Sequence, residues 1–210
     1  MKLYIYEHCP FCSRARLAFG LKGLAHDTVI LMEGDAETPM RLIGRKAVPI
    51  LEKPDGTHMG ESLDIVHYVD RIGTPMFDGP PDAALDAWGE AAWREALTLF
   101  IPRFTKGDFA ELATPAAREA YRLREERAFG DLDQLMREGE ALIPAMNARL
   151  ETLAPLLDGR ERSGISDIKL WPILRSLSIV RDLRFPTAVR AWMEGMAQAG
   201  RVGLLFDQAM

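Results

Sequence analysis

Cys9 and Cys12 are the only cysteines in the chain, and two residues separate them. An apolar, β-prone run precedes the pair at residues 3–6, and a helix-prone run follows it at residues 13–19. The pair is therefore expected at a turn from a strand into a helix. This is the position of a thioredoxin-like redox site.

The start of a helix changes the chemistry of a cysteine. The thiolate is the nucleophilic form, and the free backbone N–H groups and the helix dipole stabilise it there. The pKa of such a thiol falls from about 8.5 to roughly 3.5–7.5. Pro10 suits the first turn, where its missing N–H is not needed. We predict that Cys9 is the attacking thiol and that Cys12, one turn further in, is the resolving thiol.

Other interpretations of the pair remain open. A structural zinc ion or an iron–sulfur cluster usually takes four protein ligands, whereas this chain offers two thiols. His26, His58 and His67 have no cysteine or acidic partner at metal-binding spacing, so we predict no metal site. Two inert cysteines that lie close by chance are the remaining alternative. His8 adjoins Cys9, but neighbours in an extended segment point to opposite faces, which argues against His8 as a catalytic base.

The 210 residues have the composition of a globular protein, with 48% hydrophobic and 27% charged residues. Such a chain can form one large core or two modest ones. Its formal net charge is −5, and no Lys/Arg cluster stands clear of acidic neighbours, so a nucleic-acid partner is not expected. No apolar run reaches the ~18 residues of a membrane span, and the charged first residues do not resemble a secretory signal. Two cysteines exclude a disulfide scaffold, and a cytoplasmic location is expected.

Residues 1–72 alternate between strand-like and helix-like patterns in the order β-α-β-α-β-β-α. A helix between the first two strands implies a parallel pair. Asp55-Gly56 between the last two strands is a hairpin signal, so the sheet is mixed. Ser62 is expected to cap the last helix of this part. The expected strands are 3–6, 28–31, 48–52 and 57–59, and the expected helices are 13 to about 20 or 23, 39–43 and 63–72.

The composition changes at residues 73–82, which contain three prolines and two glycines and are predicted to form a linker. No convincing strand pattern follows. Residues 83–210 are predicted to form an all-helical domain, whereas residues 1–72 form an α/β, thioredoxin-like domain. The expected helices of the second domain are 83–100, 115–138, 140–157, 167–182 and 187–199, with breaks at Pro102, Gly107, Pro115, Gly139, Gly159, Gly164 and Pro186.

Motifs spread over the whole chain resemble one family. The Cys-Pro-x-Cys site, a Val48-Pro49 pair ahead of the hairpin and a Glu61-Ser62 pair before the next helix look like the glutathione transferase architecture. Within it, the sequence is most similar to the bacterial glutaredoxin 2 type, the glutaredoxins built like transferases. Further stretches that carry the resemblance are residues 2–6, 8–10, 35–39, 48–51, 64–70, 102–104, 114–118 and 172–175.

The resemblance implies where glutathione binds. In this superfamily the proline at the position of Pro49 is cis, and the backbone of Val48 binds the cysteinyl part of glutathione. Glu61 would take the γ-glutamyl ammonium, and Ser62 the γ-glutamyl carboxylate, in line with the affinity of helix N-termini for anions. Lys46 would reach the glycyl carboxylate. The complete implied set is Pro10, Phe11, Lys46, Val48, Pro49, Glu61 and Ser62.

The sequence departs from the family pattern at two positions. Phe11 stands where tyrosine is more usual in glutaredoxins, so a role for a phenol hydroxyl is not expected. Gly164 opens the four residues that end at Asp167, where a Ser/Thr-x-x-Asp capping box is common, so a weaker helix cap is expected. The charges of residues 118–127, with Arg122 and Glu126 at i, i+4 spacing, indicate a solvated helix face.

We therefore predict a glutathione-dependent thiol–disulfide oxidoreductase that needs no tightly bound cofactor and uses glutathione as co-substrate. Its expected partners are glutathione and proteins that carry disulfides or glutathione mixed disulfides. Two alternatives remain open: a transferase that conjugates glutathione to electrophiles, and a non-catalytic interaction module on the same fold. Turnover of a mixed disulfide as opposed to an aromatic halide would separate them.

Overall fold

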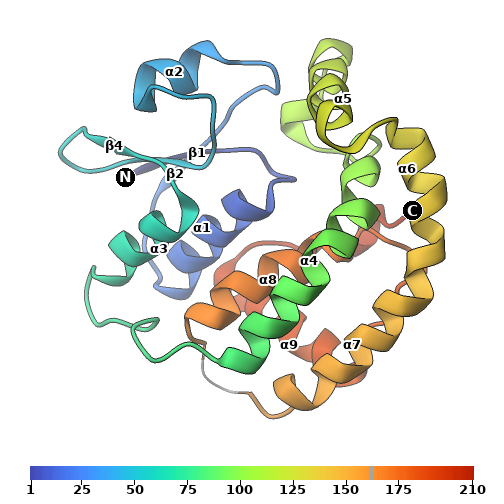
Figure 1. The fold of residues 1–210 in the computed structure, drawn as a ribbon. Coiled ribbons are helices and arrows are strands. Elements are labelled where there is room, and N and C mark those ends of the chain that lie inside the picture. The colour runs from blue at the N-terminus through green and yellow to red at the C-terminus, as the bar shows by residue number, and fades with distance from the viewer. Residues whose placement is uncertain (161–162) are drawn as a thin grey trace.

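The computed structural model describes residues 1–160 and 163–210. A four-stranded sheet with its helices forms the N-terminal domain, and a bundle of helices forms the C-terminal domain (Figure 1). The predicted fold class, a thioredoxin-like α/β domain followed by an all-α domain, is confirmed. Within the described residues, none of the helices has both the length and the apolar character that crossing a membrane requires.

The sheet has the strand order β2-β1-β3-β4 and is mixed, as predicted. Strand β1 pairs in parallel with β2, in the register Leu3 to Thr28, and antiparallel with β3, in the register Leu3 to Leu51. Strand β4 pairs antiparallel with β3 and completes the predicted hairpin. The bounds are β1 Lys2–Ile5, β2 Asp27–Ile30, β3 Ile50–Glu52 and β4 His58–Met59.

Three helices accompany the sheet. Helices α1 (Pro10–Leu21) and α3 (Ser62–Asp70) pack against each other below the sheet in Figure 1, and α2 (Glu37–Ile43) lies above it. The prediction that Ser62 caps α3 is wrong by one residue. The cap position is Glu61, with a φ of 61°, and Ser62 is the first helical residue.

The C-terminal domain contains six α-helices and three short 3-10 helices among its described residues. Helices α4 and α8 form its centre, and α5, α6 and α7 follow one another along the outer side (Figure 1). The bounds are α4 Ala83–Phe104, η1 Ala110–Leu112, α5 Pro115–Phe129, α6 Leu132–Gly139, η2 Glu140–Leu142, α7 Ile143–Leu157, α8 Ile165–Leu177, α9 Thr187–Gly200 and η3 Phe206–Gln208.

The prediction of a single helix over residues 115–138 is wrong, because α5 and α6 are two separate helices. Gly130 has a φ of 76°, which ends α5, and Asp131 caps α6 by accepting the N–H of Gln134 at 2.7 Å. Pro102 does not break α4, because it lies in the last turn, where the lost hydrogen bond affects only the helix end. The helix predicted for residues 167–182 ends at Leu177, and the hydroxyl of Ser178 donates to the Arg175 carbonyl at 2.6 Å.

Helix α8 keeps one half of a capping box although Gly164 has no side chain. The N–H of Gly164 donates to Asp167 Oδ2 at 2.8 Å. Arg160 binds the same buried carboxylate through two hydrogen bonds, of 2.6 and 2.9 Å. A side chain outside the helix therefore supports the start that glycine leaves without an acceptor.

Helix α1 joins the two domains, because it contacts α3 in one and both α8 and α9 in the other. Gly20 of α1 meets Gly200 of α9 so closely that a methyl group on Gly20 would overlap the Gly200 carbonyl group. Only glycine allows two backbones to approach in this way. The contact fixes the distance between the redox helix and the C-terminal domain.

We expect Gly20→Ala to lower the free energy of unfolding by about 1–3 kcal/mol, because the new methyl group has only backbone to displace. Gly195→Ala is the matched control. Gly195 lies in the same helix as Gly200 and has nothing within reach of an added methyl group. Gly195→Ala should therefore raise the free energy of unfolding by up to about 1 kcal/mol. Urea unfolding of both variants measures the difference, and equal effects would contradict the role of the Gly20–Gly200 contact.

Candidate active site at the start of helix α1

Cys9 occupies the N-cap position of α1, and its sulfur accepts the N–H of Cys12 at 3.3 Å. Cys9 is 8% exposed, whereas Cys12 is completely buried. The sulfur of Cys12 accepts the N–H of Tyr6 at 3.5 Å. Both thiols are free. The pair thus lies at the strand-to-helix turn where the sequence placed it, with both cysteines buried and only Cys9 retaining some exposure.

The two thiols have opposite acidities. The hydrogen bond from the Cys12 thiol is the largest influence on Cys9, and against the effect of burial it lowers the Cys9 pKa to about 7. The charge of His8 and the N–H groups of Cys12 and Phe11 act in the same direction. Burial, followed by the hydrogen bond and charge of Cys9, raises the pKa of Cys12 well above its usual value. Near neutral pH, Cys9 is the thiol that ionises.

Two hollows meet at this turn and contain all the predicted glutathione-binding residues. The first, of about 380 Å³, lies between the Cys9 turn and helices α4 and α5. The second, of about 260 Å³, leads from the turn to the start of α3. Of the predicted residues, Pro10 and Lys46 line the first, Pro49, Glu61 and Ser62 line the second, and Phe11 and Val48 line both.

The Val48–Pro49 peptide bond is cis, as the resemblance implied. Phe11 is 41% exposed, and its ring lies 5.9 Å from that of Trp93 in α4. This contact extends from the redox turn to the C-terminal domain and separates the first hollow from a further cavity between α1, α4 and α8. Phe11 therefore contributes an apolar surface beside Cys9.

The Glu61-Ser62 pair lies at the far end of the second hollow. Glu61 is exposed, and its carboxylate is 2.6 Å from Arg45 Nη2. The hydroxyl of Ser62 is buried and accepts a hydrogen bond from Arg14 Nη1 at 3.0 Å. Burial lowers the pKa of Arg14 to about 10, so the side chain still carries its charge at neutral pH. Arg14 thus adds a cation to the place where the sequence predicted a carboxylate to bind.

Sequence reasoning missed Arg124, which lines the first hollow, and Glu33, the carboxylate that pairs with it. The side chain of Glu33 is completely buried, and Arg124 Nη1 lies 2.9 Å from its Oε2. Lys46 Nζ is 3.9 Å from the other oxygen. The guanidinium of Arg124 also lies over the rings of Tyr6 and Tyr121, with its carbon 5.9 and 5.1 Å from their centres. Glu33 therefore holds two cations beside the pocket of Cys9.

Arg124 corrects the interpretation of residues 118–127 as a solvated face. Arg122 and Glu126 do form an exposed i, i+4 pair, at 2.8 Å. Ala117 and Tyr121 are buried on the opposite side of α5, and Arg124 comes one turn after Tyr121 on that same side. The buried stripe was the signal in the sequence that could have identified Arg124.

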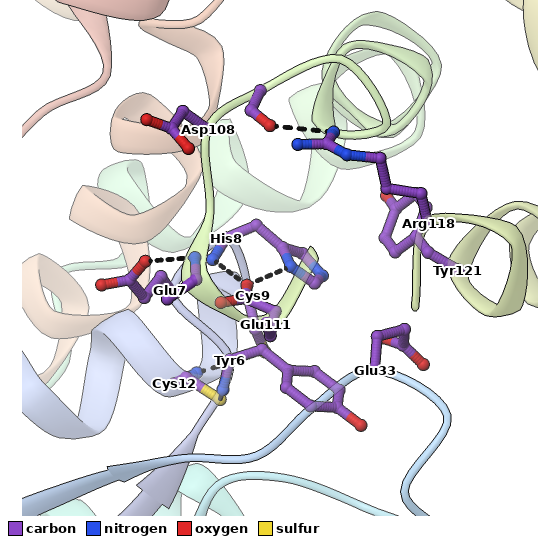
Figure 2. Close-up of polar contacts among 12 residues, drawn as sticks. Tyr6, Glu7, His8, Cys9, Cys12, Glu33, Asp108, Glu111, Arg118 and Tyr121 are labelled. Atoms are coloured by element: carbon purple, nitrogen blue, oxygen red, sulfur yellow. Dashed lines mark hydrogen bonds and ion pairs between the residues drawn. The ribbon is translucent and has the colours of Figure 1, made fainter. Parts of the chain in front are cut away.

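Over residues 1–160 and 163–210, no three His, Cys, Asp or Glu side chains gather in a way that would hold a metal ion. His8 turns its ring to Glu111 of the C-terminal domain, at 2.6 Å (Figure 2).

Comparisons with known proteins agree with this geometry. Residues 84–209 match the family described as the glutaredoxin 2 C-terminal domain, and residues 3–74 match the glutathione S-transferase N-terminal domain. A glutathione S-transferase of Ceriporiopsis subvermispora shares the fold, with a TM-score of 0.66 at 17% identity over 95% of this chain and 96% of that one. A glutathione-transferase-like fold with a redox dithiol defines a glutathione-dependent thiol–disulfide oxidoreductase.

Two relatives match over the full length. Glutaredoxin 2 of Escherichia coli K12 is 39% identical over 215 residues, which cover 100% of both chains. The crystal structure of glutaredoxin 2 from Salmonella typhimurium in complex with glutathione has a TM-score of 0.95 at 37% identity, over 100% of this chain and 98% of that one. The chain belongs to the glutaredoxin 2 family.

The acidity of Cys9 should depend on the group that residue 12 presents to it. In Cys12→Ser, a hydroxyl still donates to the Cys9 sulfur, and the alkylation rate should rise with pH through an inflection near the parent's value, about 7. In Cys12→Ala, the donor is lost, and the inflection should move up by about one pH unit. Alkylation of Cys9 by iodoacetamide from pH 5 to 10 measures both. The same inflection in the two variants would exclude the Cys12 side chain as the main cause.

Proposed function

We propose that Cys9 is the nucleophile that reduces protein–glutathione mixed disulfides and protein disulfides. The observation that carries the proposal is the Cys9 sulfur at the N-cap of α1, with a pKa of about 7 and access to a hollow beside it. The Cys9 thiolate attacks the glutathione sulfur of a mixed disulfide. The substrate thiolate leaves and takes up a proton, and Cys9 becomes glutathionylated.

The second half of the reaction regenerates Cys9. The thiolate of a free glutathione attacks the glutathione sulfur on Cys9, which releases glutathione disulfide and the Cys9 thiolate. With a protein disulfide, Cys9 instead forms a mixed disulfide with the substrate protein. Cys12 then loses its proton and attacks Cys9, which releases the substrate as a dithiol and leaves a Cys9–Cys12 disulfide for two glutathione molecules to reduce.

The two hollows suit an extended tripeptide with its sulfur at Cys9. The backbone of Val48 next to cis-Pro49 faces the cysteinyl part, and the α3 start, with Ser62, Arg14 and Glu61, takes the γ-glutamyl end. The crystal structure of the Salmonella relative is a complex with glutathione, which supports glutathione as the ligand of this site. A helix N-terminus and a guanidinium both favour a carboxylate.

At the other end of glutathione, Lys46 and Arg124 bind the glycyl carboxylate. Both line the hollow of Cys9, and both are held there by the buried carboxylate of Glu33. The expected protein substrates are cytoplasmic proteins with glutathione mixed disulfides or internal disulfides. The linker at 73–82 between domains 1–72 and 83–210 stays a prediction.

The two thiols should divide the activities. Cys9→Ser should abolish reduction of both substrate types. Cys12→Ser should keep most of the activity on a glutathione mixed disulfide, because a second glutathione resolves the intermediate, and should lose most dithiol reduction, because the intramolecular step is gone. Rates on a glutathionylated peptide and on a protein disulfide measure the split. Turnover of an aromatic halide in place of the mixed disulfide would support the transferase alternative, and no turnover of either would support a non-catalytic module.

Arg124→Gln should raise the KM for glutathione about tenfold or more, because a hydrogen bond to a charged group contributes about 1.5–3 kcal/mol. Ser62→Ala should act in the same direction at the other end of the tripeptide. Arg122→Gln removes a cation from the exposed face of the same helix, where Arg122 pairs with Glu126, and should leave the KM unchanged. Equal KM values for the Arg124 and Arg122 variants would remove Arg124 from the glutathione site.

A further inference from the structure

Three hydrogen bonds attach the C-terminal domain to the N-terminal domain near Cys9, two at the loop that carries Cys9 and one at the segment after β2. The N–H of Ala110 donates to Glu7 Oε2 at 2.8 Å, and the N–H of His8 donates to Glu111 Oε1 at 2.9 Å (Figure 2). The N–H of Glu33, in the segment after β2, donates to the Glu111 carbonyl at 3.0 Å. The 3-10 helix η1 is thus fastened to the backbone immediately before the nucleophile.

Glu111 is at the centre of this attachment. Its side chain is completely buried, and the Oε1 atom that accepts the His8 N–H also lies 2.6 Å from Nδ1 of the His8 ring. A carboxylate in such a place is costly unless a charge or hydrogen bonds compensate it. Burial raises the pKa of Glu111, but the His8 ring and the N–H groups of Glu7 and His8 outweigh it and lower that pKa below its usual value.

The ring of His8 has little freedom to leave this partner. It stacks on Tyr6 with 5.7 Å between the ring centres. Phe104, Phe109 and Tyr121 enclose it from the C-terminal domain at 5.2, 5.8 and 5.0 Å. Water is largely excluded, since His8 is only 4% exposed. The electrostatic influence of this ring on its neighbours is therefore little screened by water.

We propose that Glu111 is a positioning residue for the Cys9 thiolate: from the C-terminal domain it fixes the backbone and the ring of His8, the residue directly before the nucleophile. The inference rests on the proposed role of Cys9. The positive charge of His8 is one of the influences that lower the Cys9 pKa.

Other charged groups lie around the Glu111–His8 pair, and the variants used in the test leave these groups unchanged. Arg14 is held by Ser62, Arg124 by Glu33, and Arg175 by the Gly203 carbonyl at 2.8 Å. The titratable and charged side chains that face Cys9, His8 or Glu111 are Tyr6 and Glu7 of the loop, Cys12, Arg14 and Arg16 of α1, Glu33 after β2, Tyr121 and Arg124 of α5, and Arg175 of α8.

The test is the pH dependence of Cys9 alkylation, measured in the full chain with Cys12→Ser as the background. Glu111→Gln keeps an acceptor for the His8 N–H but removes the carboxylate that holds the His8 ring. The inflection of the Cys9 alkylation rate should move up by about one pH unit, because His8 lowers the Cys9 pKa and is no longer held beside it. Asp70→Asn is the matched control. Asp70 is also a buried carboxylate, paired with Lys22 at 3.6 Å and bonded to the N–H groups of Met76 and Phe77, far from the thiols. Asp70→Asn should lower the stability of the protein and leave the inflection of the Cys9 alkylation rate unchanged.

His8→Asn provides a second variant if Glu111→Gln does not fold, because its amide can still donate to Glu111 while carrying no charge. It should give the same upward shift, and the double variant should add nothing to either single change. An unchanged inflection in whichever of these variants folds would overturn the proposal and leave Glu111 as a structural contact only. Failure of the proposed function would be seen separately, as activity retained in Cys9→Ser.

Discussion

The hydrogen bond from the N–H of Cys12 to the sulfur of Cys9 is the interaction on which the site depends. The N-cap of a helix normally carries an oxygen acceptor such as Ser, Thr, Asp or Asn. Here a sulfur takes that place. A thiol is a weak acceptor and a thiolate a strong one. The start of α1 is therefore better capped once Cys9 has ionised, so the stability of the helix end and the acidity of the nucleophile are linked.

The rest of the fold holds this helix end in place. Strand β1 leads into the turn from the middle of the sheet, and the Gly20–Gly200 contact fixes the other end of α1 against α9. The C-terminal domain also contributes charged side chains to the site. It places Arg124 in the first hollow and Glu111 behind Cys9, and both side chains have a partner in the N-terminal domain, Glu33 and His8. Since each buried ion needs its partner, the two domains depend on each other for charge compensation.

The features that could be predicted from the sequence are those that depend on residues close together in the chain. The spacing of Cys9 and Cys12, the strand before them and the helix after them fix the redox turn locally. The break at Gly130 was missed because the polar pattern continues across it, whereas only the backbone conformation shows the end of α5. The contact of Glu111 with His8 could not be predicted from the sequence, for a different reason. Glu111 lies 103 positions from His8, and a lone glutamate in a short 3-10 helix carries no periodic signal.

The acidities of the two thiols also agree with the proposed order of reaction, in which Cys9 attacks before Cys12. Burial alone would keep Cys12 protonated, and the hydrogen bond and charge of Cys9 raise its pKa further. When Cys9 becomes part of a mixed disulfide, its sulfur is neutral, so the repulsion of a second negative charge disappears. Cys12 therefore becomes easier to ionise only after Cys9 has reacted. Its burial remains, which slows internal attack and leaves time for an external glutathione. The same fold can thus support a one-thiol route for small mixed disulfides and a two-thiol route for protein disulfides.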